Sequence, residues 1–355
     1  MLYKVGKMNN EEITFLLCPV SNEIKLELLQ QYNNIEGIWN KIYGNDNTKR
    51  LNKIKSYYNS DYVIGMKKYI DEIGAKITWI NEEKYPKQLY NLKNPPPILF
   101  YKGDIEMLEY ATTVAIVGSR TCTSYGEDFT KMLLNYLSDF HVNLISGGAR
   151  GIDTICHSYS LRYNLKTTLV LGCGIDVVYP KENYNLFKNI EKEGLILTEF
   201  LPNTKPYSYN FPTRNRIISC LSQGVIAIEA GDKSGTLITA RNALDLGKPV
   251  FALQDSFFSK TSKGCNMLLN EGAMPIISLN DIEQGFGLVR KEKIKNARDR
   301  NKNKLFNIIS DNPIYIDDLI RTANIDITTL YELLFELQLE NSIICLSGNY
   351  YTRNI

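Results

Sequence analysis

The chain has 355 residues, of which 44% are hydrophobic and 23% charged, and its formal net charge is only +2. This composition is ordinary for a folded protein of more than one domain, and the absence of any run of eighteen apolar residues excludes membrane-spanning helices. Seven cysteines without a C-x-x-C spacing, together with only two histidines, argue against a zinc site and for free thiols in a reducing compartment. We therefore expect a soluble, cytoplasmic protein that contacts no membrane and needs no metal or cofactor.

Residues 1–84 are expected to form a small helical region. Apolar residues recur there at helical spacing, as in Ile24 and Leu28, and no residues suited to catalysis or metal binding stand out. The proline run Pro95–Pro97 then excludes regular structure, and the short apolar segment Ile98–Gly103 after it is compatible with an edge strand.

Residues 85–289 change to an alternation of strands and helices. This order predicts a parallel sheet with right-handed crossovers, and near-continuous apolar strands indicate that helices cover both of its faces. The expected strands are Val114–Val117, Val142–Ile145, Thr168–Leu171, Leu195–Thr198, Val225–Ile228, Val250–Leu253 and Pro275–Ile277, and the clearest helical runs are Tyr125–Phe140 and Asp153–Tyr163.

Glycines follow four of these strands, at the edge where ligands bind in open parallel sheets. They occur in Gly118–Arg120, Ser146–Asp153, Gly172–Asp176 and Gly231–Thr236. Free backbone N–H groups in such loops bind anions. Each glycine alone is typical of an ordinary turn, and neither a G-x-G-x-x-G dinucleotide motif nor a P-loop is present. Together the four loops predict a phosphate-binding edge.

The stretch 211–240 adds cations and a ring to this edge. Arg214-Asn215-Arg216 follows Phe211 closely, and arginines beside a ring are typical of contacts with a phosphate and with a base or another ring. An ordinary βα unit with a solvated basic helix start would show the same residue types. We expect Arg120 and Arg214 to face the same edge of the sheet and each to contact a phosphate.

Residues 290–304 and 305–355 differ sharply in charge. The first segment has 8 basic and 2 acidic residues and is interpreted as a basic linker. The second has 2 basic and 7 acidic residues, and its apolar spacing predicts three helices followed by a hairpin around Ser347–Asn349. A helix that carries Glu332 and Glu340 would be repelled by phosphate, so we expect a protein contact or a regulatory role rather than the reading of duplex DNA.

Several ordered motifs resemble the DNA-processing protein A (DprA, or Smf) family. They are VAIVGSR, LISGGARGID, GCGIDVVYPKEN, FPTRNRIIS, AIEAGDKSGTLITA and KGCNMLLNEGA, and they cover about residues 105–280. The resemblance implies an extended Rossmann-like domain at 85–289 and a winged-helix-like domain at 305–355. It also implies that the chain binds and protects incoming single-stranded DNA, forms a homodimer, and loads RecA recombinase during natural transformation.

The same resemblance assigns the residues that would contact the nucleic acid. They are Gly118, Ser119, Arg120, Gly147, Gly148, Arg150, Phe211, Arg214, Asn215, Arg216, Lys233, Ser234, Gly235 and Thr236. The chain departs from the family at Gln254-Asp255, where Pro-Gly is usual, which puts the shape of that turn in question. Its N-terminal region matches the family's small helical domain only weakly.

Two other functions fit the same kind of fold. A nucleoside-monophosphate phosphoribohydrolase of the lysine-decarboxylase-like group would carry P-G-G-x-G-T-x-x-E, but Thr239 stands where the catalytic glutamate would be and supplies no carboxylate. A non-catalytic nucleotide-sensing module is also compatible with the glycine-rich edge. We expect a binding protein rather than an enzyme, in which the carboxylates near the strand ends cap helices or hold arginines. These carboxylates are Glu199, Glu229, Asp153 and Asp176.

Overall fold

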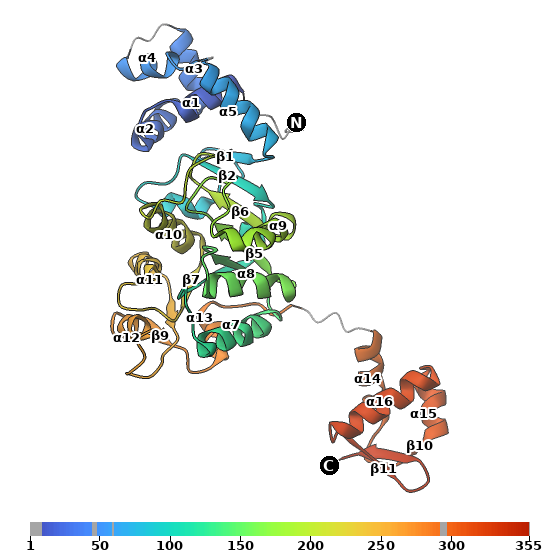
Figure 1. The fold of residues 1–355 in the computed structure, drawn as a ribbon. Coiled ribbons are helices and arrows are strands. Elements are labelled where there is room, and N and C mark those ends of the chain that lie inside the picture. The colour runs from blue at the N-terminus through green and yellow to red at the C-terminus, as the bar shows by residue number, and fades with distance from the viewer. Residues whose placement is uncertain (1–8, 45–47, 59, 292–296, 355) are drawn as a thin grey trace. The chain divides into compact units, whose positions relative to one another are not determined.

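A computed structural model describes residues 9–44, 48–58, 60–291 and 297–354, and its fold is drawn in Figure 1. The chain divides into two compact units, residues 1–290 and residues 291–355. Among the described residues, the first unit contains an N-terminal group of helices and a nine-stranded sheet, and the second contains helices and a three-stranded sheet. None of the helices in the described ranges is long and apolar enough to cross a membrane.

The N-terminal helices are α1 (Asn10–Leu17), α2 (Asn22–Tyr32), α3 (Ile35–Tyr43), α4 (Lys49–Lys55) and α5 (Asp61–Glu72). Each begins after a Ser, Thr or Asn whose side chain accepts a hydrogen bond from a first-turn N–H, which satisfies a donor that has no partner inside the helix. Their apolar faces meet around Phe15, Ile38 and Trp39, which are buried. The predicted helical region is therefore present, but it ends before residue 84 because the first strand of the sheet begins at Lys76.

The large sheet has the strand order β1-β2-β6-β5-β4-β3-β7-β8-β9. Strands β3 to β9 pair with one another in parallel. At the other end of the sheet, β1 pairs with β2, and β2 with β6, in antiparallel fashion. The strands are β1 (Lys76–Trp79), β2 (Ile98–Gly103), β3 (Thr112–Gly118), β4 (Val142–Ser146), β5 (Lys166–Val170), β6 (Leu195–Thr198), β7 (Gly224–Ile228), β8 (Val250–Ala252) and β9 (Met274–Pro275). The predicted α/β class is confirmed, and β2 is the strand expected at Ile98–Gly103. The last strand is shorter and earlier than the predicted Pro275–Ile277.

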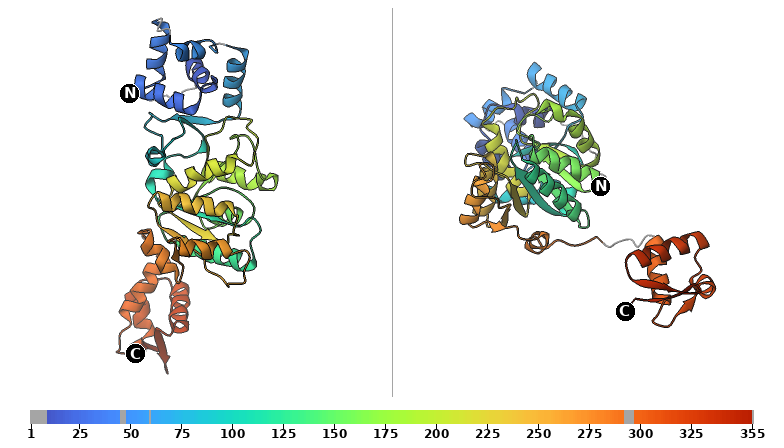
Figure 2. Two further views of the ribbon diagram at one scale, coloured as in Figure 1. Left: turned by 90° about the vertical axis from the view of Figure 1, so that its left-hand side faces the viewer. Right: turned by 60° about the horizontal axis from the view of Figure 1, so that its bottom comes forward.

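Helices cover both faces of this sheet, as the apolar strands predicted. Along β3, Val114 and Ile116 pack into one buried cluster, whereas Ala115 and Val117 pack into another, because successive side chains of a strand point to opposite faces. One face carries α7 (Ser124–Leu137), α8 (Ile152–Arg162) and α13 (Leu279–Gly285), and the other carries α10 (Asn210–Leu221) and α11 (Gly235–Asp245). In the left view of Figure 2, α10, α11 and α12 (Lys263–Asn270) lie in front of the sheet. The remaining short elements are η1 (Lys87–Asn91), α6 (Met107–Tyr110), η2 (Lys181–Asn183) and α9 (Tyr184–Glu193).

The second unit has its own apolar core. It contains α14 (Ala297–Ile308), β10 (Ile314–Tyr315), α15 (Ile316–Ala323), α16 (Ile327–Leu339), β11 (Ile343–Leu346) and β12 (Tyr350–Arg353), and its sheet has the order β10-β12-β11. Leu305, Leu319 and Leu330 are fully buried in this core. The predicted basic linker, 290–304, lies partly outside the described residues, and its later part belongs to α14 rather than to a linker. The winged-helix assignment stays a prediction.

Candidate nucleic-acid interface

The loops that follow the central parallel strands meet at one edge of the sheet, which we call the crest. It comprises residues 118–123 after β3, 147–151 after β4, 171–176 after β5 and 229–235 after β7. Because β5, β4, β3 and β7 are neighbours in that order, their loops lie side by side in the same order. Each strand was predicted to end in a glycine-containing loop, and the topology brings all four loops together.

Two glycines of the crest permit close internal packing. A side chain at Gly147 would come within 2.5 Å of the Arg214 guanidinium, so only glycine leaves room for that group. Gly151 has a φ of +71°, which L-residues rarely adopt, and a side chain there would come within 2.2 Å of the backbone oxygen of Ser119. The two glycines therefore allow the crest loops to pack closely against each other and against the Arg214 guanidinium. They also leave backbone groups of these loops near the surface.

Arg214 lies inside the protein, which differs from the expectation that it contacts a phosphate at the surface. It is only 5% exposed, and its guanidinium donates to the backbone oxygens of Gly147 (2.7 Å) and Val170 and to the Asn215 side-chain oxygen (3.0 Å). Burial lowers the pKa of Arg214 to about 10, so the group stays protonated at neutral pH. Arg214 thus joins the ends of β4 and β5 to α10.

The negative charge of Asp153, at the start of α8, acts on this guanidinium and raises the pKa of Arg214 against the effect of burial. Its carboxylate accepts a hydrogen bond from the Ala149 N–H (3.2 Å) in the loop after β4. Burial raises the pKa of Asp153, and the positive charge of Arg214 acts in the opposite direction. A buried cation and a buried carboxyl group therefore both contact the loop 147–151, Arg214 through the Gly147 oxygen and Asp153 through the Ala149 N–H.

Phe211 is the ring around which the exposed part of the crest is arranged. The guanidinium carbon of Arg120 lies 5.6 Å from its ring centroid and that of Arg214 lies 5.8 Å away, so the ring has one exposed and one buried cation as neighbours. The Tyr179 ring is 5.7 Å away, and a side chain at Gly172 would come within 2.8 Å of the Phe211 ring. The ring itself is half-buried, which leaves part of it open to a ligand.

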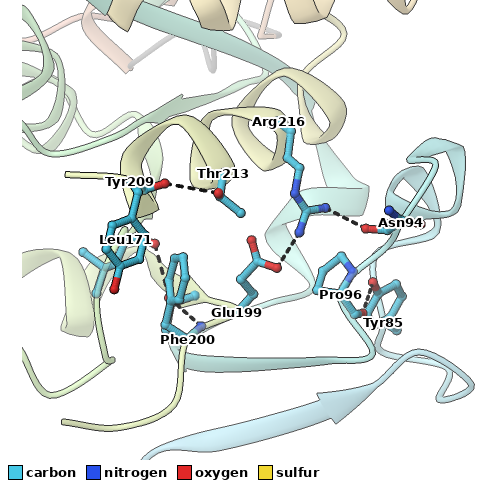
Figure 3. A network of polar contacts seen from close by, with 10 residues as sticks. Tyr85, Asn94, Pro96, Leu171, Glu199, Phe200, Tyr209, Thr213 and Arg216 are labelled. Carbon is cyan, nitrogen blue, oxygen red and sulfur yellow. Dashed lines mark hydrogen bonds and ion pairs between the residues drawn. The ribbon is translucent and has the colours of Figure 1, made fainter. Parts of the chain in front are cut away.

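Arg216 faces away from the crest, although it is only two residues from Arg214. At about 100° per residue, positions two apart on a helix point in nearly opposite directions. Figure 3 shows that Arg216 instead donates to Glu199 and to the backbone oxygen of Asn94 (2.9 Å). These residues line a separate pocket of about 570 Å³ between α10 and the start of α2. The Arg-Asn-Arg segment is therefore shared between two sides of α10.

The other predicted residues lie at the rim of the crest. Arg150 is exposed and pairs with Glu182, so its charge is partly neutralised. Ser234 caps α11 by accepting from the Thr236 N–H (3.2 Å), and Lys233 precedes it in an exposed turn. The Asn215 side chain donates to the Gly235 oxygen (3.2 Å), which joins the start of α11 to α10 and hence to Arg214. Gly148, which has a φ of +71°, packs beneath the rim against Leu169.

Glu229 is a crest residue whose structural role the sequence analysis left general. It is fully buried with a φ of +53°, a strained conformation for a residue with a side chain. Its carboxylate accepts from the Thr123 N–H (2.9 Å) and from the Thr123 hydroxyl. The group thus holds Thr123, the residue that caps α7, and ties the loop after β3 to the loop after β7. The only feature of the sequence that pointed to this role of Glu229 was its position between an apolar strand and a glycine.

The turn after β8 departs from the family pattern, and its shape rests on two side chains. Gln254 forms two hydrogen bonds with Ile276, donating to its backbone oxygen (2.9 Å) and accepting from its N–H (3.2 Å). Asp255 accepts from the Ser256 N–H (2.7 Å) and the Ser262 hydroxyl (3.1 Å). Side-chain hydrogen bonds therefore define this turn where Pro-Gly is absent.

Comparison with known proteins gives consistent results. A sequence profile described as DNA recombination-mediator protein A matches residues 76–287. Protein Smf of Synechocystis sp. is 40% identical over 212 residues, covering 59% of this chain and 53% of that protein. DNA processing protein DprA of Streptococcus pneumoniae is 40% identical over 203 residues, covering 57% of this chain and 71% of that protein. The matched segment thus spans about half the length of the Synechocystis relative.

Two solved structures share the fold. The X-ray structure of DNA processing protein A from Streptococcus pneumoniae has a TM-score of 0.68 at 32% identity and covers 79% of this chain and 98% of that one. The structure of DNA processing protein A from Helicobacter pylori, described as giving insight into its single-stranded DNA binding mode, has a TM-score of 0.54 at 32% identity. It covers 59% of this chain and 94% of that one.

Proposed function

This chain belongs to the DNA recombination-mediator protein A family, and from that premise we propose that it binds single-stranded DNA along the crest. The observation that carries the proposal is the half-buried Phe211 ring with the exposed Arg120 guanidinium 5.6 Å from its centroid. Proteins that hold single strands without regard to sequence combine cations along the backbone with rings on which bases stack. A ring and a cation on a glycine-rich strand edge provide both contacts.

The charge distribution supports binding by local groups rather than by a large positive field. Residues 101–289 contain 17 basic and 19 acidic residues, so the domain as a whole does not attract DNA. The exposed cations at the crest are Arg120, Arg150 and Lys233, and the loops there contribute backbone N–H groups. Arginine and lysine contacts release counterions, so binding should weaken as salt rises.

We propose a non-enzymatic role, because the carboxylates near the strand ends have structural partners. Glu229 accepts from Thr123, and Asp176 accepts from the Asn203 N–H (2.9 Å) and from the Tyr69 hydroxyl (2.8 Å). Glu199 accepts from Arg216, which leaves it committed to the far side of α10. Thr239 is buried in α11, where a glycosidase-like enzyme would need a carboxylate.

We further propose that the chain acts on incoming DNA in natural transformation as a cytoplasmic homodimer that loads RecA recombinase. This proposal rests on family membership. It is tested by asking whether purified protein accelerates RecA filament formation on a single strand already coated with a competing single-strand-binding protein. Failure to accelerate it would confine the role to binding.

The proposed function predicts a strong preference for single strands over duplex. Phe211 can stack only on unpaired bases, and α16, the candidate reading helix of the second unit, carries Glu332 and Glu336 and is followed directly by Glu340. Fluorescence anisotropy with a labelled thymine oligonucleotide, alone or annealed to its complement at the same salt, should give a much lower Kd for the single strand. Equal affinity for the single strand and the blunt duplex would contradict the proposal.

Removing the second unit is expected to leave single-strand binding largely intact. Residues 305–355 have 2 basic and 7 acidic residues, and Lys302 pairs with Glu336 (3.4 Å) and Glu340 (2.7 Å), so this unit offers phosphate little positive charge. One truncated chain ends after Arg290, at the boundary between the two units, and so leaves α14 uncut. A second truncated chain, residues 1–304, keeps the basic stretch 290–304. The difference in affinity between the two chains measures what that stretch contributes. A large loss of affinity in a truncated chain that keeps its circular dichroism spectrum would place the site in the second unit.

A further inference from the structure

Two adjacent phenylalanines lie almost fully in solvent in the segment that follows β8. Phe257 is 90% exposed and Phe258 89% exposed, and their rings meet edge to face with centroids 5.6 Å apart. Exposing two large apolar rings costs free energy that burial elsewhere would recover. A contiguous pair of this kind marks a surface where something binds.

The loop that carries the rings is anchored at its base. Asp255 accepts from the Ser256 N–H (2.7 Å) and the Ser262 hydroxyl (3.1 Å), and the Asn266 side chain donates to the Asp255 backbone oxygen (3.1 Å). These contacts fix both ends of the seven-residue segment between the start of the turn and α12. The rings are therefore presented from a defined base by the same side chains that replace the family's Pro-Gly.

The loop stands beside the crest. Strand β8 pairs in parallel with β7, so the segment after β8 leaves the sheet at the same edge as the loop 229–235. The two segments touch: Gly264 donates to the Ala230 oxygen (2.6 Å), and the Lys260 oxygen lies 3.8 Å from where a side chain at Gly231 would begin. The phenylalanines thus lie one strand beyond the last loop of the crest.

The charges around the rings suit a polyanion. Lys233 and Lys260 are exposed in the two adjoining loops, and Lys263 is exposed at the start of α12. The acidic neighbours are Asp232, which faces Lys263 at 3.8 Å, and Asp255, which is engaged in the turn. Lysines beside solvent-exposed rings are the combination by which single strands are held, with phosphates on the cations and bases on the rings.

We propose that Phe257 and Phe258 form a second base-stacking platform, at the opposite end of the single-strand site from Phe211. This inference rests on the proposed function and adds to it the length and polarity of the site. Phe211 lies over Gly172, just after β5, and β8 is four strands away from β5. At about 4.8 Å per strand, the ends of β5 and β8, beside which the two platforms lie, are about 19 Å apart. A stacked strand that rises about 3.4 Å per nucleotide needs about six nucleotides to reach both.

The test compares wild-type chain with Phe257→Ala/Phe258→Ala on thymine oligonucleotides of 4, 8 and 16 nucleotides. Stacking of this kind makes the two longer oligonucleotides bind the variant about tenfold more weakly or worse, while the 4-mer, which cannot span both platforms, binds both proteins equally. The slope of affinity against salt stays the same, because stacking releases no counterions. Phe335→Ala, which removes a ring 61% exposed in the second unit, is the matched control and leaves all three affinities unchanged.

A second variant separates stacking from simple apolar contact. Phe257→Leu/Phe258→Leu keeps apolar surface but removes both rings, so it should bind as weakly as the alanine variant, and Phe257→Tyr/Phe258→Tyr should restore affinity. Wild-type affinity for the 16-mer in either the alanine or the leucine variant would overturn the proposal. So would a changed sedimentation coefficient of the DNA-free alanine variant, because the rings would then serve contact between copies of the chain. If wild-type protein binds none of the oligonucleotides, the proposed function itself fails.

Discussion

Replacing Arg214 with alanine should destabilise the first unit by about 3–5 kcal/mol, because a buried charge with buried partners is removed. The change leaves the backbone oxygens of Gly147 and Val170 without their donor and Asp153 without its nearby cation. Unmade hydrogen bonds at buried acceptors are costly since water cannot replace the donor. Urea unfolding followed by circular dichroism measures the loss directly.

Two companion variants separate the causes. Arg214→Met keeps most of the side-chain volume but none of the donors, so it should lose stability almost as Arg214→Ala does. Arg120→Ala removes an exposed arginine of the same crest and should change the free energy of unfolding by less than about 1 kcal/mol. Near-wild-type stability of both Arg214 variants, with the crest residues exposed as before, would show that the guanidinium does not organise these loops.

The position of Arg214 also changes what its removal should do to binding. An exposed arginine on a phosphate would, when removed, flatten the salt dependence by about one counterion, as the sequence suggested for Arg120 and Arg214 alike. A guanidinium that donates to internal oxygens does not offer itself to a phosphate. We now expect the folded fraction of Arg214→Ala to keep the wild-type salt slope.

Phe211→Ala should weaken single-strand binding by about 1–3 kcal/mol, the range found when a ring that stacks on a base is removed. The ring is half-buried and has the Arg120 guanidinium 5.6 Å from its centroid, so its loss also removes the ring against which Arg120 lies. The slope of log affinity against log salt should stay nearly unchanged because no counterion is involved. Anisotropy titrations at three salt concentrations give both quantities.

Arg120→Ala is the complementary variant. Its guanidinium is exposed at the crest, and if it holds one phosphate the salt slope should decrease by about 0.7, the value for one charge on a single strand. The two variants should therefore differ in kind: Phe211→Ala weakens binding without changing the salt slope, whereas Arg120→Ala weakens binding and also flattens the salt slope. Wild-type affinity and slope in both would remove the crest around Phe211 from consideration.

Much of the sheet could be predicted because each strand is indicated by a short apolar run of neighbouring residues. Apolar runs such as Val114–Val117 and Val225–Ile228 are the pattern of strands covered on both faces, and both became central strands. Glycines at strand ends then located the crest, since parallel strands place their ends at one edge. The strand Lys76–Trp79 escaped prediction because it is a short edge strand that directly follows a helix, with no proline or glycine run between.

What the sequence could not supply was the orientation of single side chains. Arginine is usually exposed, so the segment Arg214–Arg216 indicated two surface cations. Arg214 instead fills the space beneath Gly147, and Arg216 reaches Glu199 on the opposite side of α10. Both outcomes depend on partners 67 and 17 residues away in the chain, and no local pattern encodes such partners.

The large sequence separation between Arg214 and its hydrogen-bond partners determines when the crest can form during synthesis. Its oxygen partners belong to residues 67 and 44 positions earlier, so the loop after β4 cannot receive its support until α10 has been made and docked. Contacts between such distant residues form late, because the intervening chain must first be ordered. A nascent chain that ends before α10 can contain β3, β4 and β5, yet it has neither Phe211 nor the cation beneath Gly147. The proposed affinity for single-stranded DNA would therefore report completion of the chain through α10 rather than of its first strands alone.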